Sequence, residues 1–328
     1  MSVWSGKRVL VTGAGGFIGS HLAERLVELG AATRALVHYR SNGSWGWLEG
    51  SPRKDDMEVI AGDVCDPDSM AQAVRGVDVV FHLAALIAIP YSYHVPASFV
   101  RTNVEGTLNV LQAARQADVS RFIHTSTSEV YGSARTVPIN ETHPVQGQSP
   151  YAATKIGADK LAESFWRSYA LPVVTVRPFN TYGPRQSSRA IVPTIITQCL
   201  TESRARLGSL TPTRDMNYVS DTVEGFIRAA LAEEAIGLTI NLGSGREISM
   251  GDLARLIGEL AGRTLLIEQE EERVRPAPSE VERLVCDHAA ARRILGWQPQ
   301  VALEDGLRFT IDWMREHLDA YRPGVYVL

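Results

Sequence analysis

The sequence predicts an α/β fold in which a doubly wound parallel sheet is followed by a smaller, α-rich C-terminal domain. Three observations support this prediction. Over the first 180 residues, short apolar runs rich in β-branched residues alternate with amphipathic helical patterns. The runs are apolar almost throughout, as expected for strands that are covered on both faces. The first run is followed directly by the glycine-rich stretch 13–19, which opens a helix. Together these features are typical of a Rossmann nucleotide-binding sheet.

The first 180 residues contain the expected elements in strict alternation. We expect a strand where β-branched and other apolar residues run together, and a helix where apolar residues recur every three or four positions. Gly30 is expected to end the first helix, because glycine readily adopts the left-handed conformation of a helix C-terminus. The expected strands are 8–12, 33–37, 57–61, 77–83, 121–126 and 173–177, and the expected helices are 20–29, 67–74, 97–116 and 151–170.

Beyond residue 180, helical patterns dominate and strand-like runs become rare. We therefore expect a dinucleotide-binding domain over residues 1–180 and a substrate-binding domain over residues 181–328, with segments near 215–245 returning to the first domain. The expected elements here are helices at 191–201, 220–231, 250–260, 289–295 and 303–318, a strand and turn at 240–245, and loops at 211–215 and 273–280.

Composition restricts the class of protein. Of the 328 residues, 45% are hydrophobic and 21% are charged, which is ordinary for a globular protein and unlike a disordered chain. A formal net charge of −4 argues against binding of nucleic acid through bulk positive charge. The most apolar stretch, 79–89, is far shorter than the roughly 20 residues that a membrane span needs. We expect neither a nucleic acid nor a membrane as a partner.

Cysteine usage and the first residues predict a cytoplasmic location. Cys65, Cys199 and Cys286 lie far apart and lack the spacing of a metal site. Sparse, unpaired thiols of this kind are typical of a reducing compartment. The apolar run at 9–12 is too short for a signal peptide. We therefore expect neither a bound metal nor a secretion signal.

A glycine loop follows the first expected strand. Gly13, Gly16 and Gly19 allow a tight turn and a close approach of the backbone to a pyrophosphate. The helix expected at 20–29, which follows Phe17 and Ile18, directs its partly positive N-terminus toward the same group. The loop therefore predicts a bound dinucleotide, and a plain glycine-rich turn is the alternative.

The end of the second expected strand bears on which dinucleotide binds. An acidic residue that binds the ribose 2′-hydroxyl is the usual signature of NAD at this position. Here the position holds Val37, and His38 and Arg40 follow it. Cationic side chains suit a 2′-phosphate, so the segment favours tightly bound NADP over NAD. The alternative is that Arg40 is a solvated loop cation and NAD binds without this contact.

The ends of the third and fourth expected strands complete the predicted cofactor site. Asp63, with Val64 after it, offers a carboxylate to the adenine amino group, although an aspartate in a surface turn is the alternative. Leu83, Ala84 and Ala85 end the fourth strand without large polar side chains, as expected where the backbone passes close to a cofactor.

Tyr151 and Lys155 form the expected catalytic pair. They are four residues apart on one predicted helix, so their side chains share a face. A neighbouring ammonium group, together with a nicotinamide cation, lowers the pKa of a phenol. The phenol can then take a proton from a sugar or alcohol hydroxyl near neutral pH. These two residues are also expected to contact the cofactor.

The sequence resembles the extended short-chain dehydrogenase/reductase family over essentially its whole length. The matching motifs are TGAGGFIG (12–19), GDV (62–64), HLAA (82–85), NVEGT (103–107), YAATK (151–155), RPFN (177–180) and YGP (182–184). Enzymes of this family act on nucleotide-activated sugars by transient oxidation at carbon 4. The resemblance implies that Thr127 supplies the hydroxyl group of a Thr/Tyr/Lys triad.

The Thr-Ser-Glu element at 127–129 resembles that of sugar-nucleotide 4,6-dehydratases, in the form seen in GDP-mannose dehydratases. Simple 4-epimerases typically lack the glutamate. The resemblance implies that Ser128 and Glu129 belong to the catalytic site. Once carbon 4 is a ketone, the proton on carbon 5 is acidic, and a carboxylate at Glu129 is suited to remove it while the 6-hydroxyl leaves as water. UDP-glucuronate decarboxylases also carry Thr-Ser-Glu, so a supporting or surface role for Glu129 is the alternative.

A finer resemblance concerns the substrate. Segments 85–93, 143–151, 185–193, 210–215 and 279–283 are similar to those of configuration-retaining N-acetylglucosamine-nucleotide 4,6-dehydratases of legionaminic acid pathways. Val37 departs from the pattern of the NAD-dependent relatives. The resemblance implies that Asn180, Arg185, Arg214 and Arg275 bind the nucleotide-sugar substrate, with Asn180, Arg214 and Arg275 at its diphosphate. Ordinary surface charge is the alternative for each arginine.

The resemblance also implies a homodimer formed through helices 97–116 and 151–170, although their apolar residues are equally suited to the core of one chain. We expect a 4,6-dehydratase that converts UDP- or GDP-N-acetylglucosamine to the 4-keto-6-deoxy sugar and returns the hydride to carbon 6. A nucleotide-sugar 4-epimerase and a UDP-glucuronate decarboxylase are the alternative enzymes. A non-catalytic, NADP-sensing regulator on the same fold is the alternative from another class.

Overall fold

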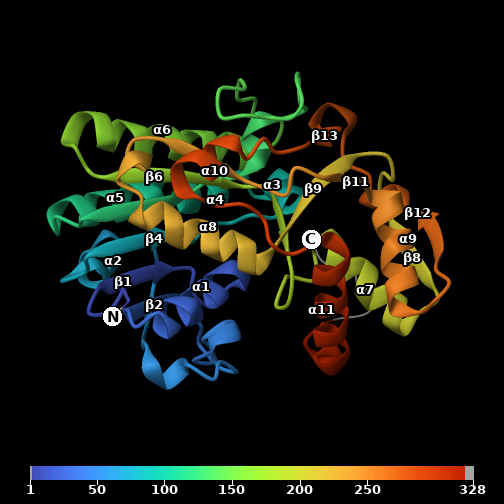
Figure 1. Cartoon of the computed structure of the whole chain (residues 1–328), viewed down its shortest axis with the longest axis horizontal. Coiled ribbons are helices and arrows are strands. Elements are labelled where there is room, and N and C mark those ends of the chain that lie inside the picture. The colour runs from blue at the N-terminus through green and yellow to red at the C-terminus, as the bar shows by residue number, and fades with distance from the viewer. Residues whose placement is uncertain (1, 322–328) are drawn as a thin grey trace.

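A parallel sheet of seven strands, in the spatial order β10-β6-β5-β4-β1-β2-β3, forms the centre of the larger lobe (Figure 1). In the computed structural model, which describes residues 2–321, the strands are β1 (Arg8–Thr12), β2 (Ala32–His38), β3 (Glu58–Gly62), β4 (Val79–His82), β5 (Arg121–Thr125), β6 (Val173–Pro178) and β10 (Thr239–Leu242). The chain runs outward from β1 to β3 and then returns to the other side of β1. The predicted doubly wound fold is confirmed, and the reversal beside β1 is where such sheets bind ligands.

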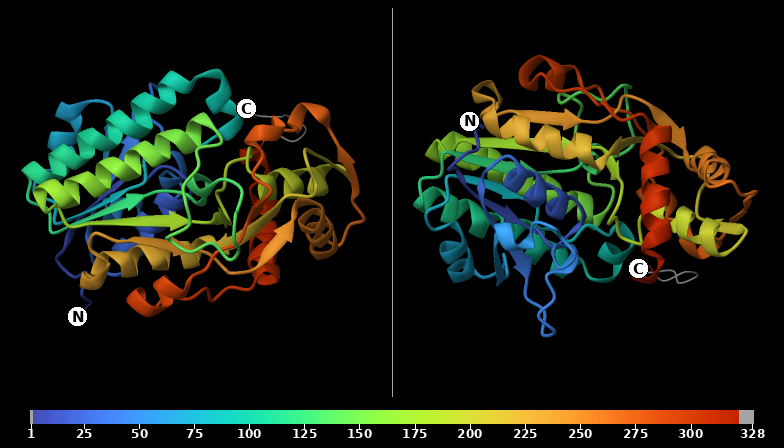
Figure 2. Two further views of the ribbon diagram at one scale, coloured as in Figure 1. Left: turned by 90° about the horizontal axis from the view of Figure 1, so that it is seen from above. Right: turned by 60° about the horizontal axis from the view of Figure 1, so that its bottom comes forward.

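Helices cover both faces of this sheet (Figure 2). One face carries α1 (Phe17–Glu28), α8 (Val219–Leu231) and α10 (Ala289–Leu295), and the other carries α2 (Pro67–Val74), α5 (Gly106–Gln116) and α6 (Pro150–Tyr169). The buried residues of β1 alternate between the two cores, since Val9 and Val11 face α1 while Leu10 faces α2. None of the helices within residues 2–321 is long and apolar enough to span a membrane.

The predicted helix 97–116 is not regular over its whole length. It consists of α4 (Pro96–Phe99), a π-helical turn at Val100–Glu105 and α5, and the short helix α3 (Ile89–His94) precedes it. The wider turn places Asn103 inside the protein, where its side chain is fully buried. Single π-helical turns inside α-helices frequently mark functional sites. This turn lies next to the N-terminal half of α6, which contains Tyr151 and Lys155.

The smaller lobe has its own hydrophobic core. Its helices are α7 (Ile191–Thr201), α9 (Met250–Ala261) and α11 (Leu303–Glu316), and its strands are β7 (Asn180–Tyr182), β8 (Arg204–Leu207), β9 (Thr213–Tyr218), β11 (Glu247–Ser249), β12 (Leu266–Gln269) and β13 (Arg283–Leu284). β9 is the centre of a small sheet that also contains β7, β11 and β13. After β9 the chain returns to the larger lobe, where α8 packs against α1 and β10 extends the parallel sheet.

The expectation of a loop at 211–215 is wrong for its last three residues, which begin β9. The strand escaped prediction because its buried side chains are polar: Arg214, Asp215 and Asn217 are each at most 5% exposed. Asp215 accepts hydrogen bonds from the backbone amides of Ser244, Gly245 and Cys286. Hydrogen bonding, rather than apolar burial, therefore holds this strand, and it leaves no hydrophobic pattern in the sequence.

Candidate functional site

The glycine loop lies at the carboxyl edge of the parallel sheet, between β1 and α1. Gly13 has a φ of +71°, and a Cβ on it would lie 2.9 Å from the backbone nitrogen of Ala84. A Cβ on Gly19 would lie 2.3 Å from the carbonyl oxygen of Gly13. Gly16 is exposed at the start of α1, ahead of Phe17 and Ile18. The bare backbone and the helix N-terminus fit a dinucleotide pyrophosphate.

A second segment crosses this loop. The strap, as we name residues 45–48, follows β2 and packs on Gly15. The backbone amide of Trp47 donates to the carbonyl oxygen of Gly15 at 3.1 Å. A Cβ on Gly46, whose φ is +66°, would lie 2.4 Å from that same oxygen. The Trp47 ring also meets the edge of Trp313 on α11, with 5.5 Å between ring centroids. The strap thus connects the glycine loop to the smaller lobe.

The other predicted cofactor residues lie at the ends of neighbouring strands. His38 and Arg40 are exposed at the end of β2. Asp63 is partly exposed after β3, and its carboxylate accepts the Cys65 amide at 2.9 Å, while Val64 is buried. Leu83, Ala84 and Ala85 leave β4 partly exposed, and the Thr12 hydroxyl accepts the amides of Leu83 and Ala84. The parallel sheet therefore brings all these residues to one edge.

Tyr151 lies in the first turn of α6 and is 6% exposed. Burial raises the pKa of its phenol, the negative charges of Glu129 and Asp159 raise it further, and a hydrogen bond with Thr127 lowers it. In the chain without a cofactor, desolvation of the phenolate outweighs the favourable contacts. A nicotinamide cation, expected from the sequence, would therefore have to add to the charge of Lys155 to bring this pKa down.

Lys155 is 4% exposed and lies one turn after Tyr151. Its Nζ donates to the carbonyl oxygen of Thr125, at the end of β5, at 2.6 Å. Burial lowers the pKa of Lys155 to about 8, although the charge of Asp159 opposes this effect. The ammonium group is therefore fixed between β5 and α6, and its charge is sensitive to pH in the physiological range.

Glu129 reaches the same site from the short helical turn Ser128–Tyr131, which follows β5. The Thr127 hydroxyl accepts the Glu129 amide at 3.2 Å and begins this turn. Ser128 is 2% exposed. The Glu129 carboxylate lies 4.0 Å from Nε of Arg214 on β9, which belongs to the smaller lobe. Thr127, Glu129 and Tyr151 therefore meet where the two lobes face each other.

Predicted substrate residues surround Glu129 from the smaller lobe. Arg214 is 5% exposed and donates to the carbonyl oxygens of Thr213 and Val281. One oxygen of Glu280 lies 3.3 Å from Nη2 of Arg214 and 3.6 Å from Nη1 of Arg275. Two guanidinium groups thus share one carboxylate beside Glu129. Among residues 2–321, the buried side-chain oxygen of Asn180 has no hydrogen-bond partner and remains able to accept one.

Arg185 lies elsewhere. Its guanidinium group forms two parallel hydrogen bonds of 3.0 Å with the Glu24 carboxylate on α1, and a third bond of 3.2 Å with the hydroxyl of Ser20. Both charged side chains are about 15% exposed. The structure therefore gives Arg185 a partner other than the predicted substrate. The partner is Glu24, 161 residues earlier in the chain. Its two carboxylate oxygens accept the two parallel N–H groups of the planar guanidinium group.

Arg185→Ala is expected to lower the free energy of unfolding by about 2 kcal/mol, because it leaves the half-buried Glu24 carboxylate without its partner. Urea denaturation measures this loss, and Glu24→Gln is the matched variant. If the pair is purely structural, the two losses will be similar and affinity for a nucleoside diphosphate will be unchanged. If Arg185→Ala instead lowers the affinity for the nucleotide and leaves the stability intact, Arg185 binds the substrate as the sequence predicts.

Two buried residues of the site were not given a role from the sequence. The Asn103 side chain accepts the Leu86 amide at 2.8 Å and donates to the Leu86 carbonyl oxygen at 2.9 Å, so it holds the segment after β4. Asp159 lies one turn after Lys155 and is bonded to groups on β5 and β6. Its spacing from Lys155 is the sequence signal that could have identified it, since residues four apart share a helix face.

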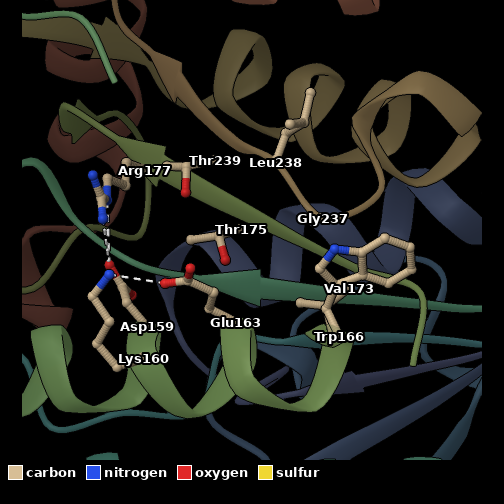
Figure 3. A pocket seen from close by; sticks show the side chains of 10 residues that line it. All are labelled: Asp159, Lys160, Glu163, Trp166, Val173, Thr175, Arg177, Gly237, Leu238 and Thr239. Carbon is tan, nitrogen blue, oxygen red and sulfur yellow. Dashed lines mark hydrogen bonds and ion pairs between the residues drawn. The ribbon is translucent and has the colours of Figure 1, made fainter. Parts of the chain in front are cut away.

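A pocket of about 140 Å³ lies beside α6, over β6 and β10 (Figure 3). Its lining includes Asp159, Arg177 and Trp166, together with the charged residues Lys160 and Glu163. Tyr151, Lys155 and Glu129 are not part of that lining. The pocket is therefore separate from the catalytic group, although the Asp159–Arg177 ion pair forms part of its wall.

Comparisons with known proteins agree with this arrangement. A family model described as GDP-mannose 4,6 dehydratase matches residues 10–310. The UDP-glucose 4-epimerase of Mycolicibacterium smegmatis is 35% identical over 314 residues, which cover 94% of this chain and 98% of that protein. The dTDP-glucose 4,6-dehydratase of Streptomyces griseus is 34% identical over 326 residues, 97% of each chain.

Similarity extends to solved structures. The crystal structure of DesIV, a dTDP-glucose 4,6-dehydratase from Streptomyces venezuelae, contains bound NAD and superposes with a TM-score of 0.88. The two chains are 30% identical, and the match covers 96% of this chain and 99% of DesIV. Both lobes of the present structure therefore have counterparts in a single solved protein.

Proposed function

This chain belongs to the extended short-chain dehydrogenase/reductase family of nucleotide-sugar dehydratases and epimerases, and from that premise we propose that it is a nucleoside-diphosphate-sugar 4,6-dehydratase. We propose UDP- or GDP-N-acetylglucosamine as its substrate. The observation that carries the proposal is Glu129, a carboxylate held between Tyr151 and Arg214 at the meeting of the two lobes. Oxidation at carbon 4 does not need this group, whereas elimination of water does.

Tyr151, Thr127 and Lys155 begin the proposed reaction. Tyr151 takes the proton of the 4-hydroxyl, Thr127 hydrogen-bonds to the phenol, and the buried charge of Lys155 stabilises the phenolate. When bound, the dinucleotide supplies the acceptor for the hydride of carbon 4, the donor that returns it to carbon 6, and a positive charge beside the phenol. The glycine loop, Asp63 and the end of β4 hold it.

Glu129 carries out the proposed elimination. The 4-ketone acidifies the proton on carbon 5, and the Glu129 carboxylate removes it while the 6-hydroxyl departs as water. A double bond forms between carbons 5 and 6, and the hydride is returned to carbon 6 while a proton from solvent is added at carbon 5. The water lost comprises the 6-hydroxyl and one proton. Because the hydride taken from carbon 4 returns to carbon 6, no reduced cofactor accumulates over a complete cycle.

Arg214, Arg275 and Asn180 bind the substrate diphosphate in this proposal. An arginine fork matches the geometry of phosphate oxygens, and both guanidinium groups already share the Glu280 carboxylate. That contact supports an affinity of the pair for anionic groups. Because a diphosphate only accepts hydrogen bonds, Asn180 binds it through the side-chain NH2 group, and its unpartnered oxygen accepts a hydrogen bond from a sugar hydroxyl of the substrate.

Proton NMR of the products formed from a panel of UDP- and GDP-sugars in deuterated water tests the proposal. A 4-keto-6-deoxy sugar with deuterium at carbon 5 is the expected product. The second candidate function is 4-epimerisation, which the similarity to the mycobacterial epimerase favours. Interconversion of 4-epimers without a 4-keto-6-deoxy product would establish that function instead.

We propose NADP as the cofactor, because the end of β2 carries His38 and Arg40 and no carboxylate. Mass spectrometry of the dinucleotide released from purified protein is expected to detect NADP. Arg40→Ala is expected to lower NADP affinity by about tenfold and to leave NAD affinity unchanged, since only NADP carries the 2′-phosphate. Release of NAD alone from the unaltered protein would contradict this proposal.

A homodimer is the proposed assembly. Helices α5 and α6 lie side by side on one face of the sheet (Figure 2). Val100, at the start of the π-helical turn, is 52% exposed on this side of the molecule and is available to a second copy. Pairing of the two helices with their symmetry mates would cover it.

A further inference from the structure

Asp159 is a buried carboxylate at the centre of a polar cluster behind the catalytic pair. It is 6% exposed and accepts hydrogen bonds from Ser126 Oγ at 2.7 Å, His124 Nε2 at 3.0 Å and Arg177 Nη2 at 2.9 Å. Figure 3 shows the Arg177 side chain directed at Asp159. Burial alone would raise the pKa of this carboxyl group, but the bond from His124 and the nearby positive charges lower it to about 2. The group is therefore ionised at every working pH.

Lys155 lies four residues before Asp159 on α6, so the two side chains share a helix face. Burial works against the charge of the Lys155 ammonium group, and Asp159 is the carboxylate whose charge opposes that effect. His82 and His124 do not add a positive charge beside Lys155 and Asp159. Burial lowers the pKa values of both histidines and keeps both rings neutral near pH 7. The titratable and charged groups around the pair are His82 on β4, His124 on β5, Arg177 on β6, Tyr151 on α6 and Glu129 on the turn after β5.

We propose that Asp159 is a positioning residue of this active site, whose carboxylate, fixed by donors on β5 and β6, keeps the buried Lys155 ammonium group charged. Charged Lys155 is what stabilises the phenolate of Tyr151. Asp159 acts through Lys155 and does not touch the substrate. The inference rests on the proposed function only in taking Lys155 as the partner of Tyr151.

The sequence makes a direct test practical, since it contains four lysines: Lys7, Lys54, Lys155 and Lys160. NMR of protein carrying isotope-labelled lysine follows each side chain through a pH titration, and Lys155→Met assigns the buried one. In the unaltered protein, Lys155 is expected to titrate near pH 8. Asp159→Asn is expected to lower that midpoint by about one pH unit, because a neighbouring negative charge is lost. Ser126→Ala, which removes one hydrogen bond from the same carboxylate but no charge, should leave the midpoint in place.

Asp159→Asn also leaves the buried Arg177 guanidinium group without its carboxylate partner, which could prevent folding. The double variant Asp159→Asn/Arg177→Met removes both charges and so avoids this defect. It is expected to retain the lowered midpoint of Lys155. In the unaltered protein, the carboxyl carbon resonance of Asp159 should follow the same midpoint as Lys155. A folded variant lacking Asp159 with an unshifted Lys155, or an Asp159 resonance that is constant through the Lys155 titration, would overturn the proposal. No substrate is used, so failure here is distinct from failure of the dehydratase proposal.

Catalysis provides a second readout. The alkaline limb of the pH–rate profile for hydride transfer from substrate is expected to move to lower pH by about one unit in Asp159→Asn. A purely structural defect would lower the height of the profile and leave its limbs in place. The two readouts together separate an effect on charge from a loss of packing.

Discussion

Glu129→Gln is expected to slow the elimination of water by about 10²–10⁴-fold, which is the usual contribution of a positioned general base. Glutamine retains the size of the side chain and keeps an oxygen facing Arg214, but it cannot take the proton from carbon 5. The first oxidation at carbon 4 needs no such group. The variant should therefore form enzyme-bound reduced cofactor when substrate is added, as measured by absorbance, without releasing a 4-keto-6-deoxy sugar.

Glu280→Gln is the matched control, since it removes a second carboxylate from the same arginine. This control should still eliminate water and incorporate solvent deuterium at carbon 5, whereas Glu129→Gln should do neither. Normal elimination by Glu129→Gln would leave the function standing but remove Glu129 from its role. Equal losses in the two variants would indicate that both residues serve only to hold Arg214.

Tyr151→Phe is expected to lower turnover by about 10²-fold or more, because it removes the group that takes the proton of the 4-hydroxyl. The ring packs in a small apolar cluster with Ile89 and Phe99, and phenylalanine preserves that packing. Circular dichroism and the unfolding midpoint should therefore be unchanged. In contrast to Glu129→Gln, this variant should form little reduced cofactor in the first turnover.

Tyr93→Phe is the control for Tyr151→Phe. The Tyr93 hydroxyl is 2.7 Å from that of Ser279 and joins the larger lobe to the loop before β13. Loss of one such hydrogen bond is expected to change turnover by less than about tenfold. Near-normal activity in Tyr151→Phe would show that another group starts the reaction.

The larger lobe was predictable because its strands are buried on both faces. Such strands leave continuous apolar runs, and the structure contains the six expected ones within a few residues of their predicted ends. The π-helical turn at Val100–Glu105 could not be predicted, since one widened turn barely changes the helical period. β9 was missed because Arg214, Asp215 and Asn217 are buried through hydrogen bonds rather than apolar contacts.

The candidate site was predictable where function depends on local spacing. Tyr151 and Lys155 share a helix, and the glycine loop is continuous in the chain, so both could be recognised from the sequence. The ion pair of Arg185 with Glu24 could not be predicted, because the two residues are distant in the chain and leave no local signal. The rise that burial causes in the Tyr151 pKa could not be predicted, because spacing does not reveal how deeply a side chain is buried.

The strap at residues 45–48 has a consequence for how long the cofactor stays bound. Its backbone is already hydrogen-bonded to Gly15, and its Trp47 ring is already in contact with α11. The conformational entropy lost in ordering these residues, about 0.5–1.5 kcal/mol for each immobilised side chain, is therefore incurred during folding rather than during association. Preorganisation of this kind favours a long residence time. An enzyme that regains its hydride in every cycle has no need to exchange the dinucleotide, so slow dissociation carries no penalty in turnover.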